Sequence, residues 1–105
     1  MTDKLIVLST AESQAEASRI AEQLVGRCLA ACVNVVSHVQ SYYHWEGKMQ
    51  RAEEFLLVIK TDQAHEEELR RAICELNSYE LPECISIPVS GGSAEYLKWI
   101  ESSLA

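Results

Sequence analysis

Short apolar runs alternate along this chain with segments whose apolar residues recur at helical spacing. The first run, residues 5–8, is apolar at every position, which is typical of a strand covered on both faces. Two hydroxyl–carboxylate pairs with capping-box spacing follow, Ser9 with Glu12 and Ser13 with Glu16. The apolar residues of 17–25 then share one helical face. Gly26 is placed to end that helix in the left-handed conformation, so the pattern predicts a strand and then a helix.

The middle of the chain has the pattern of a long β-hairpin. Residues 29–45 are predicted to be extended, and Glu46-Gly47 has the form of a two-residue turn. The return arm runs through the apolar residues 55–59 and stops at Lys60-Thr61. Arms of about 13 residues span roughly 43 Å, at about 3.3 Å per residue. A compact domain of this length has a radius of gyration of only about 13 Å, so the hairpin is expected to overhang its own core.

The remaining pattern completes an α+β domain. Asp62 can cap a second helix, and a short strand over residues 84–89 follows. Pro88 indicates that this strand lies at a sheet edge or a bulge, because proline has no N–H to donate. Gly91-Gly92-Ser93 caps a last helix. The order βαββαβ plus a C-terminal helix predicts a ferredoxin-like split βαβ fold, with one antiparallel sheet and helices on one face. Residues 1–105 contain no linker or repeat, which predicts a single domain.

The predicted hairpin carries aromatic residues near its tip. Strand alternation places Tyr42 on one face, and Tyr43 and Trp45 on the other. Exposed aromatics and unpaired strand edges promote aggregation, so we expect the hairpin to pair with another copy of this chain. The alternative is a bulge within residues 37–41 that bends the hairpin back onto its own sheet.

The composition and net charge of the chain argue against several classes of function. The chain is 48% hydrophobic and 24% charged, as in an ordinary soluble domain. A net charge of −7 argues against nucleic acid and against anionic membranes as partners. The chain lacks the run of about 18 to 20 apolar residues that would span a bilayer. The apolar run at 5–8 is too short for a signal peptide, so a cytoplasmic location is expected.

Candidate chemistry is sparse. The four cysteines, without a Cys-x-x-Cys pair, are expected to be reduced and buried. Neither a nucleophile elbow nor a glycine-rich phosphate loop is present, and the chain is predicted not to be an enzyme. His38 and His44 lie about 20 Å apart on an extended strand, at about 3.3 Å per residue, too far to share an ion. A metal site built from several chains stays open.

A small binding cavity is a further possibility. Lys60 ends the central strand, and Tyr79 and Glu80 lie in the loop before the last strand. In a split βαβ fold these residues can converge with the hairpin aromatic Trp45, and such a lining would suit a polar or anionic small ligand. The alternative is a buried Lys–Glu pair with stacked aromatics that lock an interface.

The same segments carry a resemblance to a known family. The matching residues are 29–34 (LAACVN), 41–48 (SYYHWEGK), 60–61 (KT), 79–83 (YELPE), 88–89 (PV) and 96–99 (YLKW). They resemble the CutA family of divalent-cation-tolerance proteins, in order and spacing over nearly the whole chain. The resemblance implies a ferredoxin-like subunit of a tight homotrimer, similar in architecture to the PII signalling proteins. It also implies a cytoplasmic protein linked to copper and other divalent ions, without catalytic activity.

The resemblance also assigns candidate residues. Cys32 matches the family's Ala-Cys element and is the metal candidate, for copper or another divalent cation. The trimer-interface candidates are Tyr42, Tyr43, Trp45 and Trp99. At two places this chain departs from the family pattern at residues proposed to bind copper. Leu76-Asn77-Ser78 stands where family members often have histidine, and Ser9 stands where some bacterial members have cysteine.

Three hypotheses follow. The first is a trimeric module that binds a metal ion or small ligand at clefts between subunits, lined by Trp45, Lys60, Tyr79 and Glu80. The second is a PII-like signalling or scaffold trimer that docks a protein partner and binds no metal. The third is a small acylphosphatase-like enzyme, whose glycine-rich, arginine-containing loop is missing where residues 9–12 stand (STAE).

Overall fold

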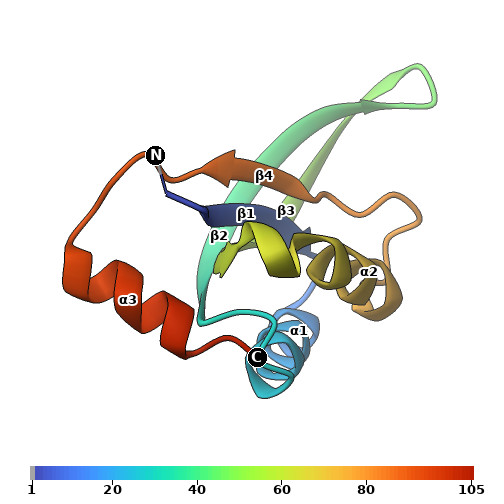
Figure 1. Ribbon diagram of the computed structural model, residues 1–105. Helices are drawn as coiled ribbons and strands as arrows, with labels where there is room; N and C mark the ends of the chain where they lie inside the picture. The colour runs from blue at the N-terminus through green and yellow to red at the C-terminus, as the bar shows by residue number, and fades with distance from the viewer. Residues whose placement is uncertain (1) are drawn as a thin grey trace.

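The computed structural model of this protein describes residues 2–105. Its elements are β1 (Lys4–Ala11), α1 (Gln14–Gly26), β2 (Cys32–Trp45), β3 (Lys48–Asp62), the 3₁₀ turn η1 (Gln63–His65), α2 (Glu66–Leu76), β4 (Ile85–Pro88) and α3 (Ala94–Ser102). The four strands form one antiparallel sheet in the order β2-β3-β1-β4 (Figure 1). This confirms the predicted α+β fold with its long β2–β3 hairpin. The short β4 is an edge strand, as Pro88 predicted.

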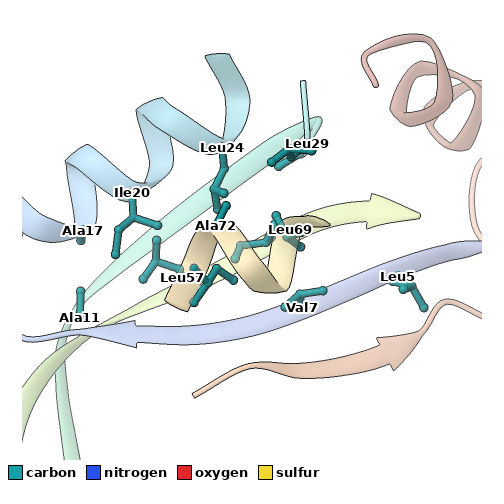
Figure 2. Close-up of a cluster of buried hydrophobic side chains, with 13 residues drawn as sticks. Leu5, Val7, Ala11, Ala17, Ile20, Leu24, Leu29, Leu57, Leu69 and Ala72 are labelled. Carbon is teal, nitrogen blue, oxygen red and sulfur yellow. The ribbon is translucent and has the colours of Figure 1, made fainter. Parts of the chain in front are cut away.

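The hydrophobic core lies between the sheet and the helices α1 and α2 (Figure 2). Alternate residues of β1 and β3 point toward these helices, among them Val7, Leu57 and Ile59, which are fully buried. The helices contribute Ala17, Ile20, Leu24, Leu69, Ala72 and Ile73. α3 lies apart from the α1–α2 layer (Figure 1), and its buried residue is Ile100. None of the helices within residues 2–105 is long and apolar enough to cross a membrane.

Capping side chains begin α1 and α3 where the sequence predicted them, whereas the predicted cap of the second helix lies one short turn before α2. Ser13 Oγ accepts the Glu16 N–H at 3.2 Å. Asp62 accepts the His65 N–H at 3.0 Å and so caps the 3₁₀ turn η1, and α2 follows at Glu66 without a side-chain cap of its own. Ser93 accepts the Tyr96 N–H at the start of α3. Each cap satisfies a backbone donor that the first helical turn leaves free.

The predicted end of α1 is wrong in one respect. Gly26 is still helical, and the left-handed residue is Cys28, with φ at +59°. The N–H groups of Leu29 and Ala30 both donate to the carbonyl of Leu24, at 3.0 and 3.2 Å. This later turn brings residues 29 and 30, which are 3% and 1% exposed, back into the core. β2 consequently begins at Cys32, three residues after the predicted start of the extended segment.

The hairpin turn is the predicted one. Glu46 and Gly47 have φ of +51° and +78°, and Trp45 pairs with Lys48. Two positive φ values in a two-residue loop match the right-handed twist of the flanking strands. The hairpin projects away from the helices (Figure 1), and the molecule measures 44 × 25 × 23 Å along its principal axes.

A β-bulge lies in β2, within the range that the sequence analysis gave for one. Val36 pairs with Leu56 and Val39 with Glu54, so Ser37 and His38 together oppose a single residue of β3. His38 has a φ of +61°. One extra residue reverses which face each later side chain occupies. Residues 33 and 35 therefore pack against the core, whereas residues 39, 41, 43 and 45 lie on the opposite face, beside Glu54.

That opposite face of the sheet carries a cluster of apolar residues and is not covered by α1 or α2. Strand register aligns its residues in rows across β4, β1, β3 and β2. Its exposed members are Val36, Ile85 and Ile87, which are 44%, 53% and 43% exposed. We call this the open face; its apolar residues are Ile6, Leu8, Val36, Leu56, Val58, Ile85 and Ile87.

Candidate functional site

A groove of about 710 Å³ lies beside the hairpin, at the end of the open face. One wall is the hairpin, and the other is the loop between α2 and β4. Its lining residues are Thr10, Ser41, Tyr42, Tyr43, His44, Trp45, Glu54, Tyr79, Glu80, Leu81, Pro82, Glu83, Cys84 and Ile85. The sequence analysis named Trp45, Tyr79 and Glu80 as cleft residues, and the fold brings these three together.

The α2–β4 loop is anchored where it enters this groove. Asn77, a buried residue, donates its side-chain N–H to the carbonyl of Thr10 at 2.8 Å and accepts the Tyr79 N–H at 2.9 Å. The Ser78 N–H donates to Glu16 Oε2 at 3.2 Å. Residues 77 and 78, part of the segment Leu76-Asn77-Ser78 in which the family resemblance implied histidine, therefore fix the loop to β1 and α1. Tyr79 is positioned by these bonds.

Glu54 and Tyr79 form the central contact of the groove. The Tyr79 hydroxyl donates to Glu54 Oε2 at 2.6 Å, and Glu54 is only 8% exposed. Burial, and then the bond to Glu54, raise the pKa of Tyr79 well above its usual value, so its hydroxyl stays a neutral donor. Burial, and then the negative charge of Glu54, also raise the pKa of Glu83. Negative charge from carboxylates is therefore concentrated in a site that is partly shielded from water.

The groove is acidic. Among residues 2–105, its lining includes the carboxylates of Glu54, Glu80 and Glu83 and no lysine or arginine. Lys60 lies away from it, on the open face, where its ammonium donates to the Asn34 side chain. Within one protomer Lys60 therefore does not join the other three predicted cleft residues. The lining favours a cation over the anionic ligand considered from the sequence.

The predicted interface residues are exposed in the protomer. Tyr42, Tyr43 and Trp45 are 59%, 44% and 39% exposed. Trp99 lies on α3, where it is 43% exposed and contacts Tyr96 with ring centroids 5.4 Å apart. Large aromatic side chains in water are unfavourable, which is consistent with a role in contacts outside the protomer.

The metal candidate Cys32 is half-buried at the start of β2, directly opposite Lys60. Residues 2–105 contain no group of three or more histidine, cysteine, aspartate or glutamate side chains that could hold a metal ion. The donors expected for copper, thiolate and imidazole, do not come together around Cys32 in one protomer. All four cysteines are free, and Cys28 and Cys74 are exposed rather than buried as expected.

Comparison with known proteins assigns the family. The family model described as CutA1 divalent ion tolerance protein matches residues 5–103. The chain belongs to the CutA1 family. Among curated relatives, it is 38% identical over 104 residues to the divalent-cation tolerance protein CutA of Pectobacterium atrosepticum, covering 99% of this chain and 94% of that protein. It is 39% identical to the chloroplastic CutA of Arabidopsis thaliana, over 94% of this chain and 54% of that protein.

Solved CutA structures have the same fold. CutA of Xylella fastidiosa superposes with a TM-score of 0.97 at 36% identity, covering 99% of this chain and all of the other. A CutA described as periplasmic, from Archaeoglobus fulgidus, gives a TM-score of 0.92 at 37% identity, over 95% and 97% of the two chains. Relatives are thus described as chloroplastic and as periplasmic.

Sequence reasoning missed two carboxylates of this CutA1 site, Glu83 and the more deeply buried Glu54. Glu54 lies in the charged run of residues 51–54 (RAEE), which has the appearance of a solvated strand end. Its burial depends on the bulge at residues 37–38, which sets the β2 side chains beside it, and on Tyr79 from a distant loop. The one signal for it in the sequence is that the apolar run of residues 55–59 begins directly after Glu54.

Proposed function

We propose that this CutA1 protein is a cytoplasmic homotrimer that binds a divalent cation or a small ligand at clefts between its protomers, without catalysing a reaction. The family assignment supports a role in divalent ion tolerance. The observation that carries the assembly is the open face, an apolar sheet surface continuous with the aromatic hairpin.

Burial of the open face explains the length and sequence of the hairpin. An apolar sheet face without a helix layer needs a second apolar surface, and three copies can supply it to one another. The hairpin, which carries Tyr43 and Trp45 near its tip, projects from the body of each protomer (Figure 1). The acidic groove lies at the border of the open face, so neighbouring protomers would complete it as a cleft.

Sedimentation equilibrium at micromolar concentration tests the assembly. We expect a mass three times the protomer mass of 11.8 kDa. Ile87→Lys places a charge on the open face and is expected to give monomers. Val25→Lys is the matched control, since Val25 on α1 is also 43% exposed. A folded wild-type monomer, or equal behaviour of the two variants, contradicts the proposal.

Direct metal binding is tested by calorimetric titration of the trimer with Cu(II), and with Cu(I) in the absence of oxygen. If Cys32 of neighbouring protomers contributes a ligand, one site per chain is expected, and Cys32→Ser abolishes it. Cys28→Ser is the control, because Cys28 lies on the exposed α1–β2 turn. Heat that does not saturate, or binding that Cys32→Ser leaves intact, contradicts a metal role for Cys32.

A second candidate function is a PII-like scaffold that docks a protein partner. It is favoured by the exposed Tyr96–Trp99 pair on α3, which is separate from the groove. If the pair docks a protein, Trp99→Ala leaves the trimer intact and abolishes co-purification of that protein. If Trp99 is instead a trimer contact, the same variant weakens assembly.

A further inference from the structure

We infer that the acidic groove binds an organic ammonium ion, held between the carboxylates of Glu54 and Glu80 and the aromatic rings of the hairpin. The inference rests on the binding role proposed above and specifies the chemical class of its ligand. It is carried by three features of the groove within residues 2–105: a buried carboxylate that pairs with no cationic side chain, an aromatic lining, and carboxylates that do not converge as a metal-binding group.

Glu54 is a buried carboxylate that forms no ion pair with a cationic side chain of residues 2–105. It is 8% exposed and accepts a hydrogen bond from the neutral Tyr79 hydroxyl. Within residues 2–105, none of the three groove carboxylates forms an ion pair, whereas Glu66, Glu67 and Glu75 on α2 each pair with an arginine. Burying an unpaired carboxylate is costly, and a cationic ligand would offset that cost.

The aromatic lining selects the kind of cation. Tyr42, Tyr43, Trp45 and Tyr79 all line the groove. Aromatic faces attract cations through the ring quadrupole, and they bind weakly hydrated organic cations such as quaternary ammonium ions especially well. A groove of about 710 Å³ has the size of a small-molecule site and is much larger than a single ion.

The arrangement of oxygen donors disfavours a bare metal ion in the same place. Divalent cations such as Ca²⁺ and Mg²⁺ take about six or more oxygen ligands at short range. The carboxylates of Glu54, Glu80 and Glu83 do not converge as a metal-binding group within the described residues 2–105. A quaternary ammonium ion needs no such convergence, because its charge is spread over the methyl groups around the nitrogen, and these can contact rings and carboxylates together.

Choline and its neutral isostere, 3,3-dimethylbutan-1-ol, provide the test, because they differ in charge and share a shape. The chain offers its own internal control, since Trp45 lines the groove and Trp99 lies on α3. The indole N–H signals of both are followed by NMR as each probe is titrated at constant ionic strength. Choline is expected to shift the Trp45 signal saturably and to leave Trp99 unchanged, with the alcohol at least about tenfold weaker.

Two variants check the carboxylates. Glu54→Gln is expected to weaken choline binding at least about tenfold, and Glu80→Gln, at an exposed position that does not endanger folding, severalfold. Glu67→Gln is the matched control, because it removes the same charge from an exposed site on α2, outside the groove. The affinity of the Glu67→Gln variant for choline is expected to stay within about twofold of the wild type, since exposed charges are well screened.

The outcomes separate this inference from the proposed function. Equal binding of choline and the alcohol, equal shifts of Trp45 and Trp99, or no saturable shift with choline overturns the ammonium assignment. If choline gives no saturable shift of Trp45 while calorimetry shows one Cys32-dependent copper site per chain, the ammonium assignment is wrong and the metal-binding trimer stands. If neither choline nor copper binds, both the ammonium assignment and the metal role of Cys32 are wrong, whatever the oligomeric state.

Discussion

His65 is held between two acceptors, and this geometry fixes its charge. Its Nδ1 lies 2.6 Å from Asp62 Oδ1, and its Nε2 lies 2.7 Å from the backbone oxygen of Ala105. Both ring nitrogens can donate only in the imidazolium form. The hydrogen bond to Asp62 raises the pKa of His65 above 6.5, the bond to Ala105 and the charge of Glu68 act in the same direction, and burial opposes them.

The stability that this contact gives to the fold is expected to depend on pH. Because the pKa of His65 is raised in the folded protein, its hydrogen bonds stabilise the fold fully at pH values below the unfolded-state pKa. This stabilisation is lost as the pH rises through the folded-state pKa. His65→Gln is expected to lower the unfolding free energy by about 1–2 kcal/mol at pH 5.5, and by less at pH 9. Urea denaturation at both pH values measures this. His44→Gln, at an exposed position, is the control, and a deficit that grows with pH contradicts the prediction.

At the scale of the elements, the bulge of β2 shapes the hairpin. Deleting His38 would restore one-to-one pairing with β3, keep Val39 opposite Glu54, and remove the bend and extra twist that the bulge gives to the hairpin. We expect this deletion to change the direction of the hairpin relative to the body of the protomer, and so to weaken the trimer and distort the groove. His38→Gly keeps the bulge and suits its φ of +61°, so it is expected to keep both.

Sedimentation and the fluorescence of Trp45 in a Trp99→Phe background measure the effect of this deletion. The sheet and helices remain in far-ultraviolet circular dichroism, because the core residues of β1, β3, α1 and α2 are unchanged. A deletion variant that forms the wild-type oligomer would show that the bulge does not direct the hairpin.

Local chemistry made most of the elements predictable. Ser13, Asp62 and Ser93 mark helix starts through bonds within three residues, and Glu46-Gly47 marks its turn through backbone conformation alone. The end of α1 was not predictable, because it depends on the burial of residues 29 and 30 in a core assembled from distant strands.

The candidate site was predictable only in part. Trp45, Tyr79 and Glu80 could be named from the sequence, and the structure places all three in one groove. Lys60 could not be excluded, because its face depends on the register of β3 against β2. Glu54 was missed because its burial needs a bulge and a loop that no local pattern near residue 54 encodes.

At the scale of the whole molecule, charge opposes the proposed assembly. Each protomer carries a net charge of −7, and the acidic groove lies at the border of the open face. Three such protomers repel one another over distances that salt can screen, since the Debye length is about 10 Å at 0.1 M. The apolar contacts that favour assembly are not weakened by moderate salt.

The strength of assembly is therefore expected to depend on salt, because charge repulsion opposes it and apolar burial favours it. Raising sodium chloride from about 0.02 to 0.3 M is expected to tighten protomer association, with a severalfold lower dissociation constant, because screening removes repulsion and leaves the burial of the open face intact. Sedimentation equilibrium over a dilution series measures it. An assembly held mainly by ion pairs between protomers would weaken with salt instead. Association that weakens would therefore contradict both this prediction and the assignment of the open face as the principal contact.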